Sequence, residues 1–435
     1  MTEVIDHARD VSVFRPAGPR YRWWVHGVAV VMVLCTFSLL TVGGIVTTLG
    51  EGLAVYDGWT SFGYYVPLAP LEYWVHDTGK LVEHGHRLIG KVVGVVAIAL
   101  AAVLWFTHPR KLANGEANPR RWLAWLGVFL LLAVIVQGAK GAFRIDFADF
   151  KLAEDGTKVI GADGFPIRVD NGWSIGLALV HGVFGQVVFA GTVLVAAAVG
   201  PGWVRWAKER AGKLESRKAE NSESGGGLSD SRARGLRWAA GALLLALVLQ
   251  LVLGATVRHL GAWNAIPDFP LTWGYVLPPV DQDVLERGGA LGPDFANGTT
   301  VGKVHTQYVH RVGAVVVTGV AVWVMVAVWR RRSGDGLRGL MWVLGLLLVG
   351  QWVLGIGAAM IGRGEPAWGS AHQVGGALLL ATATLTAARA WRARGVVVEA
   401  ESKALPGASE SAAVGAMAGV SGVAGASGVA KAGGA

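Results

Sequence analysis

Eight long apolar segments dominate this chain of 435 residues and restrict it to one class of fold. An α-helix of about 20 apolar residues is long enough to cross the hydrocarbon core of a bilayer. Only helices or closed barrels can cross it, because lipid offers no partner to backbone polar groups. We therefore predict an all-α integral membrane protein with eight transmembrane helices. The predicted spans are residues 24–49, 82–106, 121–143, 173–199, 236–258, 304–329, 339–361 and 367–391.

The composition supports a membrane location. Only 16% of the residues are charged and 53% are hydrophobic, whereas a soluble domain usually carries about 25% charged residues. The net charge is +9, but Lys and Arg fall in short connections between apolar segments. We therefore expect membrane lipid, and not nucleic acid, as a partner. The single cysteine, Cys35, excludes an intramolecular disulfide.

Clusters of Lys and Arg in alternate connections predict the orientation of the spans. They precede the first span, follow the eighth, and separate the second span from the third, the fourth from the fifth and the sixth from the seventh. Cytoplasmic loops are enriched in these residues. Both termini are therefore predicted to be cytoplasmic, in a multi-pass protein of the cell (inner) membrane. The first span lacks a convincing signal-peptide cleavage site and is interpreted as an anchor.

The chain also contains an internal repeat. Residues 48–67 align with residues 259–278 at an offset of 211 (259 − 48), and His86-Arg87 falls on His310-Arg311 at an offset of 224 (310 − 86). The repeat predicts two pseudo-symmetric four-helix bundles, each with a cofactor site between its helices. The predicted parts are a cytoplasmic N-terminal segment (1–23), an N-terminal half (24–206), a cytoplasmic linker (207–235), a C-terminal half (236–391) and a disordered cytoplasmic tail (392–435).

Four histidines lie near the start of the even-numbered spans, all toward the predicted outer side. They are His86, His181, His310 and His372. At about 1.5 Å per residue, their depth below the outer surface is roughly 6–14 Å. Two helices need such a shared depth to ligate one planar macrocycle from opposite faces, so the pattern predicts bound haem. The alternative for any single histidine is a hydrogen bond between helices.

Charged side chains accompany these histidines. The first half has Glu83-x-x-His86-Arg87, where the second half has Gln307-x-x-His310-Arg311. Ionisable residues within membrane spans usually mark functional sites. Glu83 is a catalytic candidate, and its alternative role is a salt bridge with Arg87. Arg87 and Arg311 are candidates for binding haem propionates, or structural partners of helix ends and loop carboxylates. The aspartates of the third outer connection, Asp163 among them, are interpreted as a solvated acidic loop.

Several motifs in order resemble one known family. They are Glu83-x-x-His86-Arg87, Gln137 to Gly141, Val180-His181-Gly182, Leu253 to His259 continuing to Pro270, Val309 to Ala314, and Ala371-His372-Gln373-x-Gly375. From about residue 28 to 390, the chain resembles the haem A synthases of cytochrome oxidase assembly. The resemblance implies oxidation of the C8 methyl group of haem O to the formyl group of haem A.

The resemblance also implies roles for the residues. The four histidines would be axial ligands of haem iron, with haem b between His310 and His372 and the substrate haem O in the N-terminal half. Arg258 is a further cofactor-binding candidate, and its repeat position holds Thr47. A carboxylate at Glu83 can accept a proton or stabilise positive charge during methyl oxidation. The first half is therefore predicted to be catalytic, and the second half to transfer electrons.

Some relatives carry cysteine pairs in two outer loops, but Ala265 and Thr272 stand at these positions of the second loop. No thiol-disulfide step is therefore expected in electron delivery. Candidate partners are haem O synthase, cytochrome oxidase subunits and a membrane electron donor.

Two alternative functions remain at this point. A dihaem b-type transmembrane electron-transfer protein would explain the four histidines but not the difference between Glu83 and Gln307. A non-catalytic haem-binding oxidase assembly factor would bind haem without forming a product.

Overall fold

The computed structural model describes residues 21–112, 115, 117–205, 227–295, 298–330, 336–361 and 365–403, without the side chains of residues 227–233 and 392–403. Most of the predicted N-terminal segment, linker residues 207–226 and the tail from residue 404 lie outside the described residues. The predictions for these parts stay predictions.

The described residues contain eight helices that are long and apolar enough to cross a membrane, as predicted. Two of them extend far beyond the predicted spans. α6 begins at Gly227, within the predicted linker, and α10 continues to Lys403, past the predicted end of the eighth span at residue 391. The eight are α1 (Trp23–Leu49), α2 (Thr78–Thr107), α3 (Arg121–Asp146), α4 (Gly172–Val199), α6 (Gly227–His259), α8 (Val301–Trp329), α9 (Leu337–Met360) and α10 (Pro366–Lys403).

Side-chain caps set the outer starts of three helices. Asp77 accepts a hydrogen bond from the Lys80 N–H of α2, and Thr300 accepts one from the Lys303 N–H of α8. Asn171 and Ser174 form a reciprocal capping box at the start of α4. Each cap satisfies a backbone donor that has no partner inside the helix. These caps fix where three of the four histidine-bearing helices begin.

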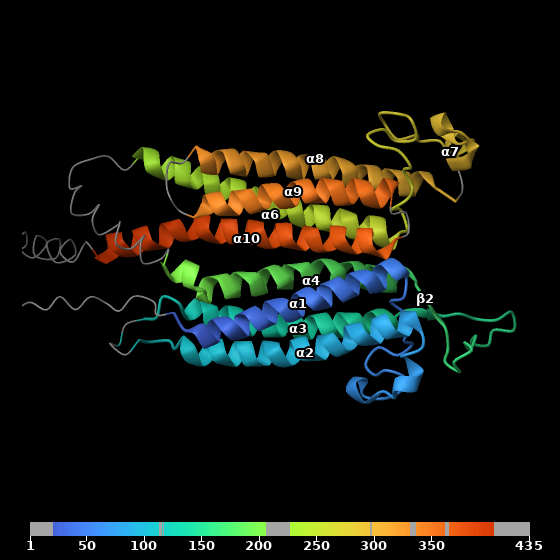
Figure 1. Cartoon of the computed structure of the whole chain (residues 1–435), viewed down its shortest axis with the longest axis horizontal. Helices are drawn as coiled ribbons and strands as arrows, with labels where there is room; N and C mark the ends of the chain where they lie inside the picture. Colours follow the sequence, from blue (N-terminus) through green and yellow to red (C-terminus); the bar gives the residue numbers. More distant parts are fainter. Residues whose placement is uncertain are drawn as a thin grey trace, which may run out of the picture.

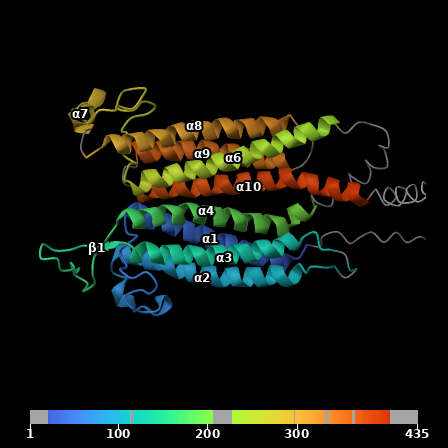
Figure 2. The same ribbon diagram turned by 180° about the vertical axis from the view of Figure 1, so that it is seen from behind.

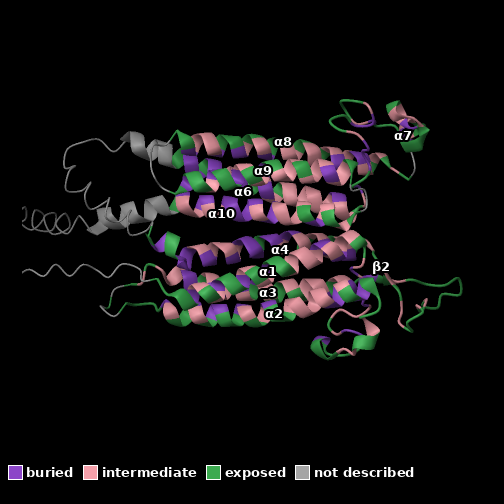
Figure 3. Cartoon of the chain, viewed as in Figure 1, coloured by how far each residue is buried: buried purple, intermediate pink, exposed green. Residues whose placement is uncertain are grey.

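The helices form two groups that lie side by side with their axes nearly aligned (Figures 1 and 2). In the first group α1 packs on α2 and α4, and α3 packs on α2 and α4; in the second, α8 packs on α6 and α9, and α10 packs on α6 and α9. Helices α1 and α4 contact α10, and α4 also contacts α6. Buried residues concentrate on α4 and α10, each 56% buried over its apolar window against 22–28% for the other spans (Figure 3). α4 and α10 therefore form the centre of the molecule.

The connections that the sequence predicts to be outer, and that keep this name below, all lie at one end of the helices (Figure 1). The first contains the short 3₁₀-helices η1 (Val66–Leu68) and η2 (Leu71–Tyr73). The third connection of the chain, which joins α3 to α4 and is here called the third outer connection, is a hairpin of β1 (Asp149–Phe150) and β2 (Arg168–Val169). The two strands pair antiparallel, with Asp149 opposite Val169. In the second half, α7 (Gln282–Glu286), η3 (Gly289–Leu291) and η4 (Pro293–Phe295) follow α6, while α9 and α10 are joined by only a short connection.

The same aspartate turn occurs in the first outer connection of each half. The Asp57 carboxylate accepts hydrogen bonds from the N–H groups of Phe62 (3.0 Å) and Gly63 (2.9 Å). Asp268, at the repeat offset of 211 residues (268 − 57), accepts two 2.8 Å bonds from Trp273 and Gly274. The carboxylate holds the backbone of Trp273 at a φ of 56°, a left-handed conformation that residues other than glycine rarely adopt. The repeated residues thus build the same turn twice.

An arginine from the neighbouring helix fixes each turn. Arg87 donates to three carbonyl oxygens of the first loop, and Arg311 donates to three of the corresponding loop of the second half. The acceptors are Val55 (3.1 Å), Asp57 (2.7 Å) and Thr60 (2.6 Å) for Arg87, and Ile266 (3.3 Å), Asp268 (2.8 Å) and Leu271 (3.1 Å) for Arg311. All three pairs of acceptors are separated by the offset of 211 residues.

The aspartate turn predicts a stability effect. Asp268→Ala removes two charge-assisted hydrogen bonds and should destabilise the fold by about 2 kcal/mol or more. Thermal unfolding in detergent should show a midpoint lowered by several degrees. Asp294→Ala, the same change at an exposed outer position, serves as the control. Equal midpoints for the two variants would contradict a structural role for the turn.

Candidate functional site

The four histidines form two pairs, one in each half. The ring centres of His86 on α2 and His181 on α4 are 6.4 Å apart, with 72° between the ring planes. Those of His310 on α8 and His372 on α10 are 6.2 Å apart, with 79° between the planes. The structure therefore brings together all four histidines selected from the sequence, in matching arrangements.

The spacing fits two imidazoles that share one metal ion. Two nitrogens bound to one metal at about 2 Å lie about 4 Å apart, and each ring centre lies about 1 Å further back, which gives about 6 Å in total. Among the described residues, no group of three or more His, Cys, Asp or Glu side chains is placed to hold a metal ion. Each pair therefore supplies two ligands, and a metal held between them needs its other ligands from a macrocycle such as haem.

A glycine on the preceding helix makes room for each imidazole. A Cβ atom at these positions would lie 2.8–3.3 Å from the histidine Cε1 atom, closer than nearly all Cβ contacts in proteins. Glycine therefore allows the ring to lie directly against the backbone of the neighbouring helix. The four seats are Gly43 for His86, Gly141 for His181, Gly254 for His310 and Gly355 for His372. The sequence repeat contains Gly141 and Gly355, but their contact with histidine appears only in the structure.

One cavity of about 860 Å³ is lined by both histidine pairs and reaches across both halves. This size lies within the roughly 300–1,000 Å³ typical of ligand pockets. Its lining is mainly apolar, and its charged members are Glu83, Arg87, Lys91, Arg144, Arg258, Arg311 and Glu365. The two histidine sites are therefore connected within the protein.

The first of these charged residues, Glu83, is buried, at 4% exposure, and both of its carboxylate oxygens are engaged. Oε2 accepts the Val55 N–H at 2.8 Å, and Oε1 accepts a hydrogen bond from Arg87 at 2.8 Å. The salt bridge expected as an alternative role is therefore present. It leaves Glu83 at the cavity wall, one helical turn from His86.

Gln307 has the corresponding contact in the second half. Its Oε1 accepts the Ile266 N–H at 2.6 Å, and its Nε2 donates to the Trp263 carbonyl at 2.8 Å. Ile266 is the repeat position of Val55 (266 − 55 = 211). A neutral amide thus performs the same structural task as the carboxylate. The loop contact therefore does not need a charged side chain, whereas the salt bridge with Arg87 is formed by Glu83 in the first half.

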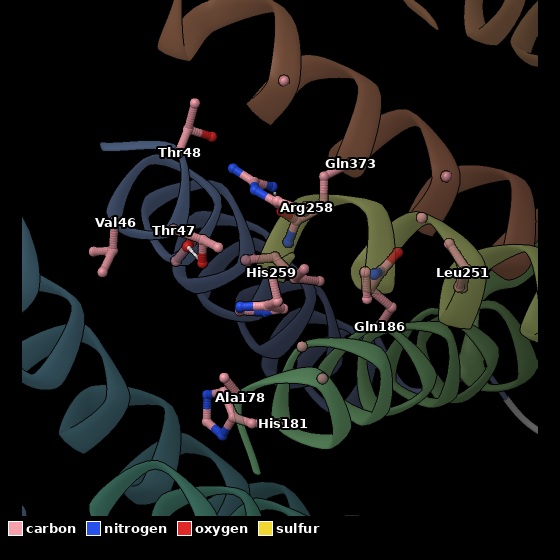
Figure 4. Close-up of a pocket in the computed structure, with 18 of the residues that line it drawn as sticks. Val46, Thr47, Thr48, Ala178, His181, Gln186, Leu251, Arg258, His259 and Gln373 are labelled. Atoms are coloured by element: carbon pink, nitrogen blue, oxygen red, sulfur yellow. Dashed lines mark hydrogen bonds between the residues drawn. The ribbon is translucent and has the colours of Figure 1, made fainter. Parts of the chain in front are cut away.

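The predicted arginines differ in their surroundings. Arg87 and Arg311 bind oxygen atoms of the outer loops, mainly backbone carbonyls, which agrees with their alternative role as structural partners. Propionate binding by either arginine stays a prediction. Arg258 donates to the Gln373 side chain and to the Gly44 carbonyl of the first half. Figure 4 shows Arg258 beside Gln373, with Thr47 and Thr48 of α1 nearby. Arg258 therefore joins the two halves at the cavity.

Sequence reasoning missed Arg144. It lines the cavity from the last turn of α3, and a Cβ at Gly52 would collide with its guanidinium group. Asp170 lies 3.6 Å from one of its terminal nitrogens, while its buried Nε has no hydrogen-bond partner among the described residues. Alanine stands at the repeat position, Ala358 (358 − 144 = 214). The sequence signal that could have identified Arg144 is that this basic residue corresponds to an alanine in the second half of the repeat.

The third outer connection also covers the first half. Asp163 pairs with Lys80 at the start of α2, and Phe165 stacks on Tyr56 with ring centres 5.0 Å apart. Phe165 also contacts Phe62 and Tyr73. Asp163 is itself exposed, as the interpretation of a solvated acidic loop predicts, and it forms this ion pair in addition. The hairpin folds back because its aromatic and acidic side chains find partners on the first outer connection.

The loop beside Glu83 predicts a pH effect. Burial, followed by the nearby Asp77 and Glu83 carboxylates, raises the pKa of Glu51 above its ordinary value of 4.5. Because the pKa is raised in the folded state, the folded protein favours the protonated form of Glu51. The stability that this protonated form contributes is fully present below about pH 4.5 and is lost as pH rises through the higher folded-state pKa. Glu51→Gln should therefore raise the thermal midpoint at pH 8 and leave it nearly unchanged at pH 4. Glu154→Gln, at an exposed position, should have no effect at either pH; a matching gain there would refute the explanation.

Comparison with known proteins gives a consistent result. The profile of the cytochrome oxidase assembly protein family (COX15-CtaA) matches residues 26–384. A haem A synthase of Mesorhizobium japonicum is 26% identical over 371 residues, which cover 80% of this chain and 86% of that protein. One from a Methylobacterium species is 24% identical over 412 residues, 89% of this chain and 96% of its own.

A shorter match has a higher identity. A haem A synthase of Beijerinckia indica is 34% identical over 160 residues, which cover 36% of this chain and 42% of that protein. The family profile covers most of the chain, including all four paired histidines and Glu83. The chain therefore belongs to the cytochrome oxidase assembly protein family.

Proposed function

We propose that this protein is a haem A synthase, an oxidoreductase that converts the C8 methyl group of haem O to the formyl group of haem A. Relatives that match over most of their length carry this name. The observation that carries the proposal is the difference between two otherwise matching sites. Each has a histidine pair over glycine seats, but Glu83 lines the first where Gln307 lines the second.

The two halves divide the work. His86 and His181 bind the substrate haem O, and His310 and His372 hold a resident haem b. Haem b supplies one-electron transfer when bound. Both histidine pairs line the same cavity, which supports the joint use of the two sites. A site that only transfers electrons needs no ionisable group beside its ligand, which agrees with the neutral Gln307.

Glu83 acts at the edge of the substrate. Oxidation breaks C–H bonds of the methyl group: the electrons pass to an external oxidant, and a proton is released while positive charge develops near the porphyrin edge. A buried carboxylate there can accept a proton or stabilise that charge. Arg87, at 2.8 Å, keeps Glu83 oriented, and the Val55 N–H holds its other oxygen.

Cations at the cavity recognise the carboxylates of the substrate. Arg144 and Lys91 line the cavity from the first half, where the repeat positions hold Ala358 and Val315. Arginine binds carboxylates through two parallel hydrogen bonds, and Arg144 has a buried Nε without a partner among the described residues. Arg144 therefore supplies the cation that Thr47, the repeat position of Arg258, cannot supply.

The protein works at the outer side of the cell membrane, with both termini in the cytoplasm. Lys and Arg clusters in the alternate connections support this orientation. The histidine-bearing helices start at the end that carries the long connections. The partners that this role implies are haem O synthase, oxidase subunits and a membrane electron donor.

The resident cofactor can be tested by removing its ligands. His310→Ala or His372→Ala should remove most of the low-spin haem b signal from purified protein, because each pair supplies only two ligands. Optical and electron paramagnetic resonance spectra measure it. His305→Ala, on the same helix, should keep the signal. Haem b that survives at full content in both ligand variants would rule out this site.

The catalytic role can be tested by an isosteric change. Glu83→Gln should fold and keep haem b, because Gln307 makes the same loop contact in the second half. Conversion of haem O to haem A should fall by about 10²–10⁴-fold, as expected for loss of a positioned acid or base. The haems are extracted from cells that make haem O but no haem A of their own.

The control is Glu72→Gln, which makes the same change at an exposed glutamate of the outer connection. It should leave haem A production unaltered. Full haem A production by Glu83→Gln at wild-type expression would make the carboxylate structural only.

A further inference from the structure

Three of the four paired histidines are tied to the preceding helix by a glutamine. The side-chain amides of Gln137, Gln250 and Gln351 each donate a hydrogen bond of 2.9 Å to the backbone carbonyl of a histidine, namely His181, His310 and His372. Each glutamine lies four residues before the glycine that seats the same histidine. One helical turn thus supplies both a seat for the imidazole and a clamp for the backbone behind it.

His86 is the exception. Four residues before its seat, Gly43, stands Leu39, on which Gln250 falls at the repeat offset (250 − 39 = 211). Leu39 lines the cavity and packs against the apolar core of the first half. A leucine cannot donate a hydrogen bond, so the helix that carries His86 lacks the clamp that the other three histidine helices have.

The missing hydrogen bond affects how firmly a ligand is held. A single hydrogen bond between helices changes an equilibrium by about three- to tenfold, in water or in a membrane. The two histidines of the second half are both clamped, and so is His181. Of the two pairs, only the first therefore has one histidine with the glutamine hydrogen bond and one without it.

This asymmetry matches what the proposed function asks of each half, and the inference rests on that function. A resident haem has to stay, whereas a substrate haem has to enter and a product haem has to leave. We infer that the three glutamines are positioning residues that fix metal-ligating histidines, and that Leu39 makes His86 the releasing ligand through which haem exchanges in the first half.

The clamp can be tested first in the second half, without turnover. Gln250→Leu gives His310 the surroundings of His86. Carbon monoxide binds reduced haem only when an axial histidine leaves, so its binding rate reports ligand release. In dithionite-reduced protein, Gln250→Leu should bind carbon monoxide to haem b about three- to tenfold faster than the wild type. An unchanged rate would overturn the clamping role.

Gln186→Leu is the matched control. It makes the same chemical change in the same cavity, but the Gln186 side chain lies beside Gly376 of the other half and not against a paired histidine. Its carbon monoxide rate should equal that of the wild type. A rate increased as much as in Gln250→Leu would also overturn the clamp, since any lost glutamine would then loosen the site.

The reciprocal variant tests the first half. Leu39→Gln should supply the missing clamp, so the ratio of haem O plus haem A to haem b in protein purified from haem O-producing cells should rise about three- to tenfold, while turnover falls. Gln137→Leu removes the existing clamp and should lower the same ratio, which keeps the test valid if Leu39→Gln does not fold. An unchanged ratio in correctly folded variants would overturn the assignment of His86.

The outcome separates this inference from the proposed function. A wild-type protein that contains haem b but makes no haem A would refute haem A synthesis. The carbon monoxide rates of Gln250→Leu and Gln186→Leu would still decide whether the glutamine is a clamp. Normal haem A synthesis with unchanged rates and ratios would keep the proposed function and refute the inference.

Discussion

The contact between an imidazole ring and a glycine of the neighbouring helix is the constraint on which the site depends. It occurs four times, between successive helices α1 and α2, α3 and α4, α6 and α8, and α9 and α10. Because each ring lies against backbone, the position of a histidine is set by the packing of a helix pair and not by its own rotamer alone. The matching ring separations of 6.4 and 6.2 Å follow from the same packing used in each half.

A second constraint acts at the outer end of the helices. Arg87 and Arg311 are partly buried cations, and several carbonyl acceptors offset the cost of removing them from water. The acceptors are supplied by a loop that the Asp57 or Asp268 carboxylate has already turned. The loop in turn presents a backbone N–H to Glu83 or Gln307. One network therefore orders the loop, closes the site and orients the residue in which the halves differ.

The differences between the halves lie in a few side chains on a shared framework. The residues that differ are Glu83, Arg144 and Leu39 in the first half. The corresponding repeat positions of the second half hold Gln307, Ala358 and Gln250. These exchanges add a carboxylate and a cation to one site and remove a hydrogen bond from one ligand helix. All three changes fall in the half proposed to act on an exchangeable substrate, and the second half, where Gln250 keeps its hydrogen bond to His310, fits a site that holds its cofactor.

The sequence by itself determined the eight spans, the shared depth of the four histidines and the position of Glu83. These features depend on local hydrophobicity and helical spacing, which any 20-residue window carries. The repeat offset also predicted which residues would correspond, from Asp57 and Asp268 to Arg87 and Arg311. The partners of the arginines were left open, because a guanidinium group can bind a propionate or a loop carbonyl with the same chemistry.

Only the tertiary structure decided which groups meet. It paired His86 with His181 across α2 and α4, bent the third outer connection over the first so that Asp163 reaches Lys80, and brought Arg144 to the cavity. It also directed Arg258 from one half to Gly44 of the other. These contacts join residues far apart in the chain, and their geometry comes from the packing of whole helices, which no local pattern contains.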